Sequence, residues 1–147
     1  MAVTWCDTAG QEDFAHLRQL CYSQINAAVI CFSVTDRKSF DNVKDKWIDE
    51  VRCHCPNVPV ILMGTMTDRR EDSKPTQQLR VKSSKSVSTR EGIKMAAYLK
   101  AVTYVECSAF DKESVHSVFN DAVVTALGLG PERLVSPAVQ CAGCTIL

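Results

Sequence analysis

The chain carries no excess of charge of either sign. Among its 147 residues, Lys+Arg number 17 and Asp+Glu number 17, so the formal net charge is zero. A protein that binds nucleic acid through its phosphates needs a basic surface, and this balance gives no indication of one. We therefore expect no nucleic-acid partner. The sequence also lacks an apolar run long enough to span a bilayer, so no transmembrane segment is predicted.

Metal-ligand and disulfide patterns are also lacking, although the chain contains eight cysteines. No charged-then-apolar leader precedes them, so we expect no secretion signal. Several, such as Cys31, lie inside apolar runs, and we expect buried reduced thiols of a cytosolic protein rather than disulfides. Cys53-His54-Cys55 is too tightly spaced for the usual zinc ligands and has no second pair at the expected distance, so no metal site is predicted there.

Short apolar runs alternate with helical patterns along the chain. The runs are residues 2–6, 27–34, 58–63 and 103–107, and the middle two are typical of strands covered on both faces of a parallel sheet. Helical patterns follow at residues 39–51, 89–100 and 114–127. This order predicts a doubly wound α/β fold. Ligands of such folds bind beyond the carboxyl ends of the strands.

Two polar segments interrupt this order. Residues 69–87 are too long for a simple connection and are interpreted as an insertion, with a short helix near residues 76–82. Its first charged residues, Arg69 and Arg70 among them, are interpreted as solvated. From Gly128 the pattern ends in Gly, Pro and Ser, so we predict one domain over residues 1–127 and a flexible tail over residues 128–147.

Three of the predicted strands end in distinctive loops. They are Asp7-Thr8-Ala9-Gly10-Gln11-Glu12, Gly64-Thr65-Met66-Thr67-Asp68 and Glu106-Cys107-Ser108-Ala109-Phe110. Taken alone, each loop can be a turn or a helix cap, and the second and third are weak signals. Because all three follow predicted strands in order, a chance occurrence is improbable, and we expect functional sites just after Cys6, Met63 and Cys107.

Together these motifs resemble the Ras superfamily of small GTPases. Residues 7–12 look like the start of switch II, residues 65–68 resemble the base-reading Asn/Thr-Lys-x-Asp motif, and Ser108-Ala109 resembles the second base-contacting loop. The insertion after Asp68 is similar to the extra helix of the Rho branch. The resemblance covers residues 3–127 and the last four residues. It implies GTP or GDP and Mg²⁺ as ligands, and Rho-type regulators and effectors as partners.

The resemblance also implies a role for each loop residue. Asp68 would accept hydrogen bonds from the guanine ring N–H and amine, and the N–H of Ala109 would donate to the guanine carbonyl; Thr65 and Ser108 complete these two motifs. Asp7 would help to hold Mg²⁺ through water. Gly10 would bring its N–H to the γ-phosphate, and Gln11 would orient the attacking water, as in the Ras mechanism that serves as the general template for this reaction.

The sequence departs from the family pattern at its start. No G-x-x-x-x-G-K-[S/T] motif occurs, so the phosphate-binding loop and switch I of the family are missing, and the chain reads as N-terminally truncated. We expect an incomplete Ras-like parallel sheet of P-loop NTPase type with flanking helices, and weak or absent nucleotide binding. Either the chain is unstable or residues 2–6 pair directly with residues 27–34. Met66 also replaces a lysine that is frequent in the family, and Trp5 stands one residue early.

The last four residues, Cys144-Thr145-Ile146-Leu147, form a C-a-a-X box, and the final leucine favours geranylgeranylation of Cys144. One lipid gives marginal membrane residence, so a second signal is usual. Cys141 is either a palmitoylation site or an idle exposed thiol. The tail predicts a location at the cytoplasmic face of membranes.

Two functional hypotheses follow. The first is a Rho-like, GTP-dependent signalling switch whose GTP binding and hydrolysis are impaired or absent in this chain, with Gln11 as the catalytic residue if hydrolysis survives. The other is a non-catalytic, prenylated interaction module or a non-functional fragment of a Rho GTPase.

Overall fold

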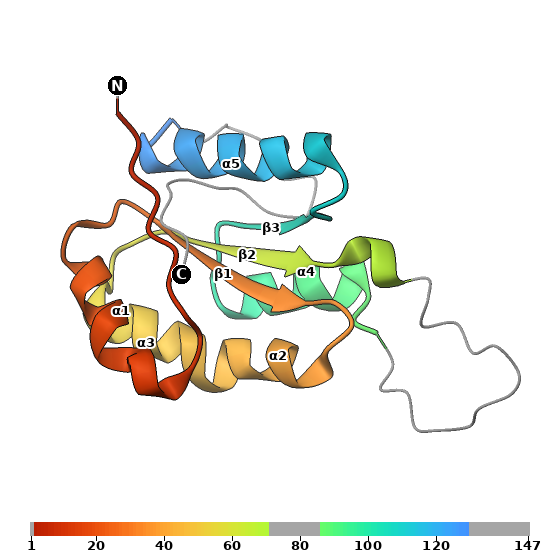
Figure 1. Ribbon diagram of the computed structural model, residues 1–147, viewed down its shortest axis with the longest axis horizontal. Coiled ribbons are helices and arrows are strands. Elements are labelled where there is room, and N and C mark those ends of the chain that lie inside the picture. Colours follow the sequence, from red (N-terminus) through yellow and green to blue (C-terminus); the bar gives the residue numbers. More distant parts are fainter. Residues whose placement is uncertain (1, 71–85, 130–147) are drawn as a thin grey trace, which may run out of the picture.

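A parallel sheet of three strands forms the centre of the computed structural model, which describes residues 2–70 and 86–129 (Figure 1). The strands are β1 (Ala28–Ser33), β2 (Val60–Thr65) and β3 (Thr103–Glu106), in the order β1-β2-β3. Ala28 pairs with Val60, and Ile61 pairs with Thr103. The predicted α/β fold with a parallel sheet is thus confirmed.

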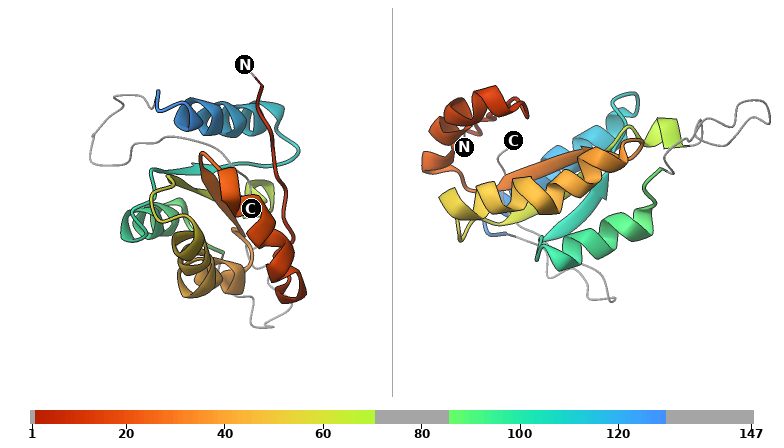
Figure 2. Two further views of the ribbon diagram at one scale, coloured as in Figure 1. Left: turned by 90° about the vertical axis from the view of Figure 1, so that its left-hand side faces the viewer. Right: turned by 90° about the horizontal axis from the view of Figure 1, so that it is seen from below.

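Helices cover both faces of this sheet (Figure 2). One face carries α2 (Arg37–Asn42), the π-helical turn η3 (Val43–Trp47), α3 (Ile48–His54) and α4 (Thr89–Tyr98), and the other carries α5 (Lys112–Ala126). Residues of β1 alternate between the two cores: Ile30 and Phe32 pack in the larger core, whereas Val29 packs with Ala122 of α5. No helix within the described residues is long and apolar enough to cross a membrane.

The prediction of a strand at residues 2–6 is wrong. Residues 2–10 form no regular structure and cross from the side of α5 toward α1 (Ala15–Cys21) (Figure 1). Trp5 packs edge-on against Phe119 of α5, with ring centroids 4.6 Å apart. A cleft of about 620 Å³ lies between residues 2–6, the connection that follows α1 and the end of α5. This packing holds the segment outside the sheet.

The predicted pairing of residues 2–6 with β1 is therefore also wrong. The N–H groups of Ala28 and Val34 donate to Pro59 and Thr65, each at 3.0 Å, so the even-numbered residues of β1 direct their backbone groups toward β2. In a parallel ladder the intervening residues, Val29 and Cys31, then face the opposite edge. Within the described residues, that edge of β1 has no neighbouring strand.

A disulfide joins Cys6 to Cys21 at the end of α1. The expectation of reduced thiols is wrong for this pair, because the path of residues 2–10 brings together two cysteines that lie 15 positions apart. Cys31, Cys53, Cys55 and Cys107 are free thiols.

The helices agree with the predicted patterns but differ at their ends. Asp36 caps the helical run that was predicted from residue 39, and Asp111 caps α5 two residues earlier than expected. Lys100 has a positive φ of 52° just beyond α4, so that helix ends at Tyr98. The one-turn 3₁₀ helices η1 (Glu12–Phe14), η2 (Tyr22–Gln24) and η4 (Thr67–Arg70) complete the described elements. The helix predicted near residues 76–82 lies outside the described residues.

Helix α4 begins directly after Ser88, which is its N-cap residue. The Glu91 N–H donates to Ser88 Oγ at 3.3 Å, and the Ser88 N–H donates to Glu91 Oε2 at 2.9 Å, which completes a capping box. Arg37 Nη1 of α2 donates to Glu91 Oε1 at 2.8 Å. The hydrogen bond from Arg37 and those from Ser88 lower the pKa of Glu91 to about 2.

We expect Glu91→Gln to weaken the fold at neutral pH more than in acid. The folded pKa lies below the ordinary value of 4.5, so the stabilisation is present above pH 4.5 and is lost as the pH falls toward about 2. Urea unfolding at several pH values should therefore show wild type and variant converging below pH 4.5. Arg37→Gln, which removes the main cause of the shift, should give part of the same convergence. A difference that stays constant from pH 7 to pH 3 would contradict this assignment.

Tyr104 of β3 lies in a space left by two glycines. A Cβ on Gly92 of α4 would overlap the Tyr104 ring, and a Cβ on Gly64 of β2 would lie 2.6 Å from its hydroxyl oxygen. The absence of both side chains lets α4 approach the sheet with the tyrosine between them. Gly92 is itself buried.

We expect Gly92→Ala to destabilise the protein, although alanine favours a helix over glycine by about 1 kcal/mol. The added methyl group overpacks the site against Tyr104, which costs about 1–3 kcal/mol. Chemical denaturation of the single variant, and of the same change in a Tyr104→Ala background, isolates this contact. The cost should vanish in that background; a single variant more stable than wild type would disprove the overlap.

Candidate functional site

Two of the three predicted loops meet beyond the carboxyl ends of β2 and β3. Asp68 lies in η4 after β2, and Ser108 lies in the loop after β3. Ser108 Oγ donates to Asp68 Oδ1 at 2.6 Å. The Cys107 N–H donates to the Gly64 carbonyl at 2.9 Å, so the ladder between the strands continues to the base of these loops. The motifs thus form one site, 40 residues apart in sequence.

The site combines one buried residue with two exposed ones. Ser108 is buried, whereas Asp68 and Ala109 are exposed. Ser108 Oγ also accepts from the Phe110 N–H at 3.2 Å, which holds the loop around Ala109. A carboxylate and a backbone N–H on two exposed residues of neighbouring loops can accept from one edge of a ligand and donate to the same edge.

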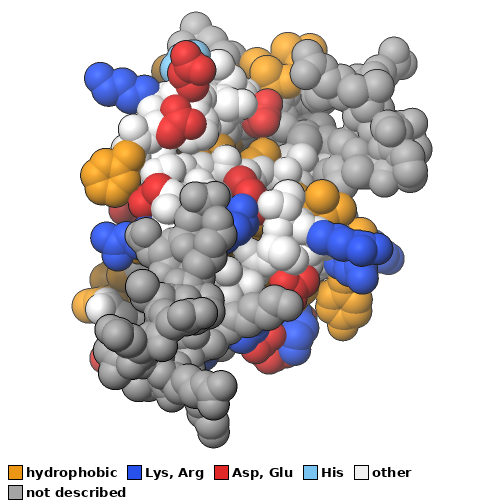
Figure 3. Space-filling model, turned by 90° about the vertical axis from the view of Figure 1, so that its right-hand side faces the viewer, with side chains coloured by type: hydrophobic (Ala, Val, Ile, Leu, Met, Phe, Trp, Pro, Cys, Tyr) orange, Lys and Arg blue, Asp and Glu red, His pale blue; other side chains and the backbone are white. Residues whose placement is uncertain are grey.

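Exposed apolar side chains border the pair. Met66, between Thr65 and Asp68, has a positive φ of 60°, and its side chain is 45% exposed. Phe110 is 84% exposed. Thr65 ties the end of β2 to β1, because its Oγ1 donates to the Phe32 carbonyl at 3.1 Å. On this face charged side chains of both signs are scattered among uncharged atoms, and hydrophobic side chains lie mostly toward the margins (Figure 3).

The remaining predicted loop, residues 7–12, lies apart from this pair. Asp7, Gly10 and Gln11 are exposed, and no hydrogen bond between described residues joins them to Asp68 or Ser108. A Cβ on Gly10 would lie 3.5 Å from Trp47, an ordinary contact, so packing does not demand glycine here. A cavity of about 210 Å³ adjoins the loop and is lined by Thr8, Gly10, Arg18, Tyr22, Ile30, Cys31 and Trp47.

Arg18 holds this loop and was not foreseen. Its Nη1 donates to the carbonyls of Ala9 and Gln11 at 2.9 and 2.7 Å, and its Nε and Nη2 donate to Glu50 at 2.7 and 3.0 Å. The guanidinium is 2% exposed. The hydrogen bond from Arg18 is the largest cause that lowers the pKa of Glu50, and Tyr22 donates to the same carboxylate. A lone arginine in a helix gives no sequence signal of such a partner.

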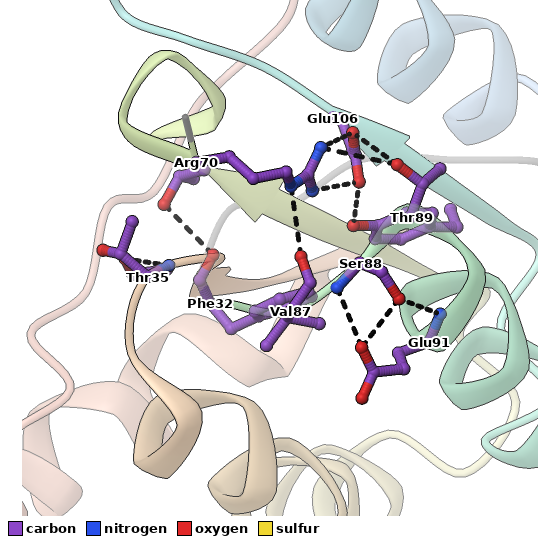
Figure 4. Close-up of polar contacts among 11 residues, drawn as sticks. Phe32, Thr35, Arg70, Val87, Ser88, Thr89, Glu91 and Glu106 are labelled. Atoms are coloured by element: carbon purple, nitrogen blue, oxygen red, sulfur yellow. Dashed lines mark hydrogen bonds and ion pairs between the residues drawn. The ribbon is translucent and has the colours of Figure 1, made fainter. Parts of the chain in front are cut away.

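The interpretation of Arg70 as solvated is wrong. Its guanidinium forms a two-fold pair with Glu106 at the end of β3, and the two side chains are 25% and 21% exposed (Figure 4). Residues 71–85 of the insertion lie outside the described residues, as do Cys141 and Cys144. The predicted lipid sites therefore remain predictions.

Residues 1–127 match the protein-family model described as the Ras family. The match covers most of the chain, and the chain therefore belongs to the Ras family. Its members are small GTPases, which act as GTP-binding switches, and the mixed α/β fold with a parallel sheet agrees with that assignment.

We expect Arg18→Met to destabilise the protein by about 3–5 kcal/mol, because it leaves Glu50 partly buried without its partner and frees two carbonyls of the Asp7–Gln11 loop. Urea unfolding measures the loss, and limited proteolysis should show faster cleavage at residues 7–11. The double variant with Glu50→Gln should recover part of the stability. Lys44→Met, which removes an exposed pair with Asp45, should change little. If Arg18→Met and Lys44→Met lowered the free energy of unfolding equally, the role of Arg18 in holding the loop would be refuted.

Proposed function

We propose that this chain is a Rho-type guanine-nucleotide switch protein whose 147 residues recognise the guanine base but bind the phosphates weakly. The observation that carries the proposal is the 2.6 Å hydrogen bond from Ser108 to Asp68 beside the exposed Ala109. That contact orients a carboxylate next to a backbone donor at the edge where an α/β sheet binds ligands.

The donor set fits guanine better than adenine. Guanine offers a ring N–H and an amine that both donate, and these match the two oxygens of Asp68. The guanine carbonyl can accept a hydrogen bond from the Ala109 N–H. Adenine has an amine at the same position, so two donors would face each other. Met66 and Phe110 add exposed apolar surface on which a purine face can pack.

This chain offers few groups that could bind the phosphates of a nucleotide. The 147 residues contain no G-x-x-x-x-G-K-[S/T] motif, whose backbone N–H groups and lysine neutralise phosphate oxygens. Asp7 provides one carboxylate for Mg²⁺, which usually takes one or two carboxylates together with phosphates and water. Among the described residues, no three His, Cys, Asp or Glu side chains cluster as a metal site. Gln11 is the residue to orient the attacking water when GTP and Mg²⁺ are bound.

The Rho assignment rests on the insertion at residues 69–87 and on the loop motifs. With it come Rho-type regulators and effectors as partners, and a lipid anchor at the cytoplasmic face of membranes. Cys144 is the proposed prenylation site, and Cys141 is a candidate for a second acyl chain.

A second candidate function is a prenylated interaction module without catalysis. Three exposed apolar side chains at and along α1 favour it: Phe14 is 40%, Leu17 47% and Leu20 73% exposed. Such a surface suits binding to another protein whether or not nucleotide is present.

Titration calorimetry of the 147-residue chain tests the main proposal. Guanosine and GDP should bind with similar, weak affinity, because the phosphates add little, and adenosine should not compete. Asp68→Asn should reverse the preference from guanosine to xanthosine, because the amide can donate to the xanthine carbonyl that replaces the amine.

Asp111→Asn is the matched control, because asparagine caps α5 as well as aspartate does and the base preference should stay unchanged. Stoichiometric GDP in the purified chain would refute the weak phosphate binding. Equal binding of guanosine and adenosine would refute base recognition and favour the interaction module.

A further inference from the structure

A dense polar cluster lies at the ends of η4 and β3, close in sequence to the base-reading pair of Asp68 and Ser108. Arg70 Nη2 donates to Glu106 Oε1 at 2.6 Å, and Arg70 Nη1 donates to Glu106 Oε2 at 2.8 Å. Parallel hydrogen bonds of this kind fix the planes of both groups, which a single contact does not. Arg70 ends η4 and Glu106 ends β3, so the pair joins the two segments that carry Asp68 and Ser108.

Two further side chains donate hydrogen bonds to the carboxylate oxygens of Glu106. The Tyr104 hydroxyl donates to Oε1 at 2.6 Å, and Thr89 Oγ1 of α4 donates to Oε2 at 3.2 Å. Arg70 is held from its other side, because its Nε donates to the Val87 carbonyl at 3.1 Å (Figure 4). Elements on three sides therefore fix this ion pair, and neither partner can turn without breaking several hydrogen bonds.

The charge of Glu106 is secure at neutral pH. Burial raises its pKa, but the hydrogen bonds from Arg70 and Tyr104, with the charge of Arg70, outweigh burial and lower the pKa overall. The ion pair therefore persists over the physiological pH range.

The position of this pair gives it control over the site. Arg70 follows Asp68 by two residues in the same helical turn, and Glu106 precedes Ser108 by two residues. Backbone hydrogen bonds join the two loops at their base, because the Cys107 N–H donates to the Gly64 carbonyl at 2.9 Å and the Thr67 N–H donates to the Cys107 carbonyl at 3.4 Å. The ion pair of Arg70 and Glu106 adds a side-chain attachment on the far side of Asp68 in the sequence, and we infer that it sets the direction of the Asp68 carboxylate.

We propose that Arg70 and Glu106 are positioning residues that align Asp68 for two-point recognition of guanine. The inference rests on the proposed function, and it makes base selectivity depend on an ion pair that does not touch the base. The competing view is that the pair only stabilises the fold at the start of the insertion.

The ratio of guanosine affinity to inosine affinity distinguishes these two views. Inosine lacks the exocyclic amine, which in guanosine would donate a hydrogen bond to the second oxygen of Asp68. Arg70→Lys keeps the charge but cannot form the two-fold pair. We expect it to reduce the ratio of guanosine to inosine affinity by about tenfold, the effect of losing one hydrogen bond to a charged group. A purely structural role would lower both affinities equally and leave the ratio unchanged.

Matched variants control for general loss of stability. Arg37→Lys alters a comparable ion pair, with Glu91, between α2 and α4, and it should leave the ratio unchanged. Tyr104→Phe removes one donor from Glu106 and keeps the ring, so it should lower the ratio less than Arg70→Lys does. It also serves as the test variant if Arg70→Lys does not fold.

A readout without nucleotide keeps this inference separate from the proposed function. In amide NMR spectra of the free chain, Arg70→Lys should shift the signals of Asp68, Ser108 and Ala109 and speed their hydrogen exchange, whereas Arg37→Lys should not. If wild type does not discriminate guanosine from adenosine, the proposed function fails, and the NMR comparison still decides whether the pair positions Asp68. Unchanged amide signals in Arg70→Lys, or in Tyr104→Phe if that variant is used instead, would overturn the proposal.

Discussion

Strand β2 is the constraint on which the rest of the structure depends. It is hydrogen-bonded to β1 on one side and to β3 on the other, and Val60, Ile61 and Leu62 are fully buried between helices on both faces. Because both ladders are parallel, the carboxyl ends of β2 and β3 lie at one edge of the sheet. The pairing of the strands therefore brings residues that are distant in sequence to the same edge, and contacts between the loops are not required for this.

Two ion pairs fix the loops that the apolar core alone does not hold in place. Arg18 with Glu50 holds the loop of Asp7 and Gln11, and Arg70 with Glu106 holds the segments of Asp68 and Ser108. Each arginine donates to backbone carbonyls as well as to its carboxylate. Desolvation makes such pairs poor sources of net stability, but their many directed hydrogen bonds favour one loop geometry. The exposed site residues are thus positioned by partly buried charges.

The prediction of the fold from sequence was best for buried elements. The Val- and Ile-rich runs of β1 and β2 lie between two layers of helices, and that pattern is typical of strands covered on both faces. Residues 2–6 are also apolar, but β-forming residues make a strand only where a partner strand is available. In this structure Trp5 packs on Phe119 instead. The disulfide of Cys6 with Cys21 was missed for the same reason, because it depends on the path of that segment.

The sequence by itself determined the alternation of strands and helices and the residues of the loops after β2 and β3, because buried periodicity and short motifs are local properties of the chain. Only the tertiary structure decided which charges are partners. Arg70 follows Asp68 by two residues in a polar run that resembles a solvated segment, and nothing local reveals Glu106, 36 positions away, as its partner. Ion pairs of this kind arise when separate elements pack together, so their physical cause lies in the packing of the sheet and not in either segment alone.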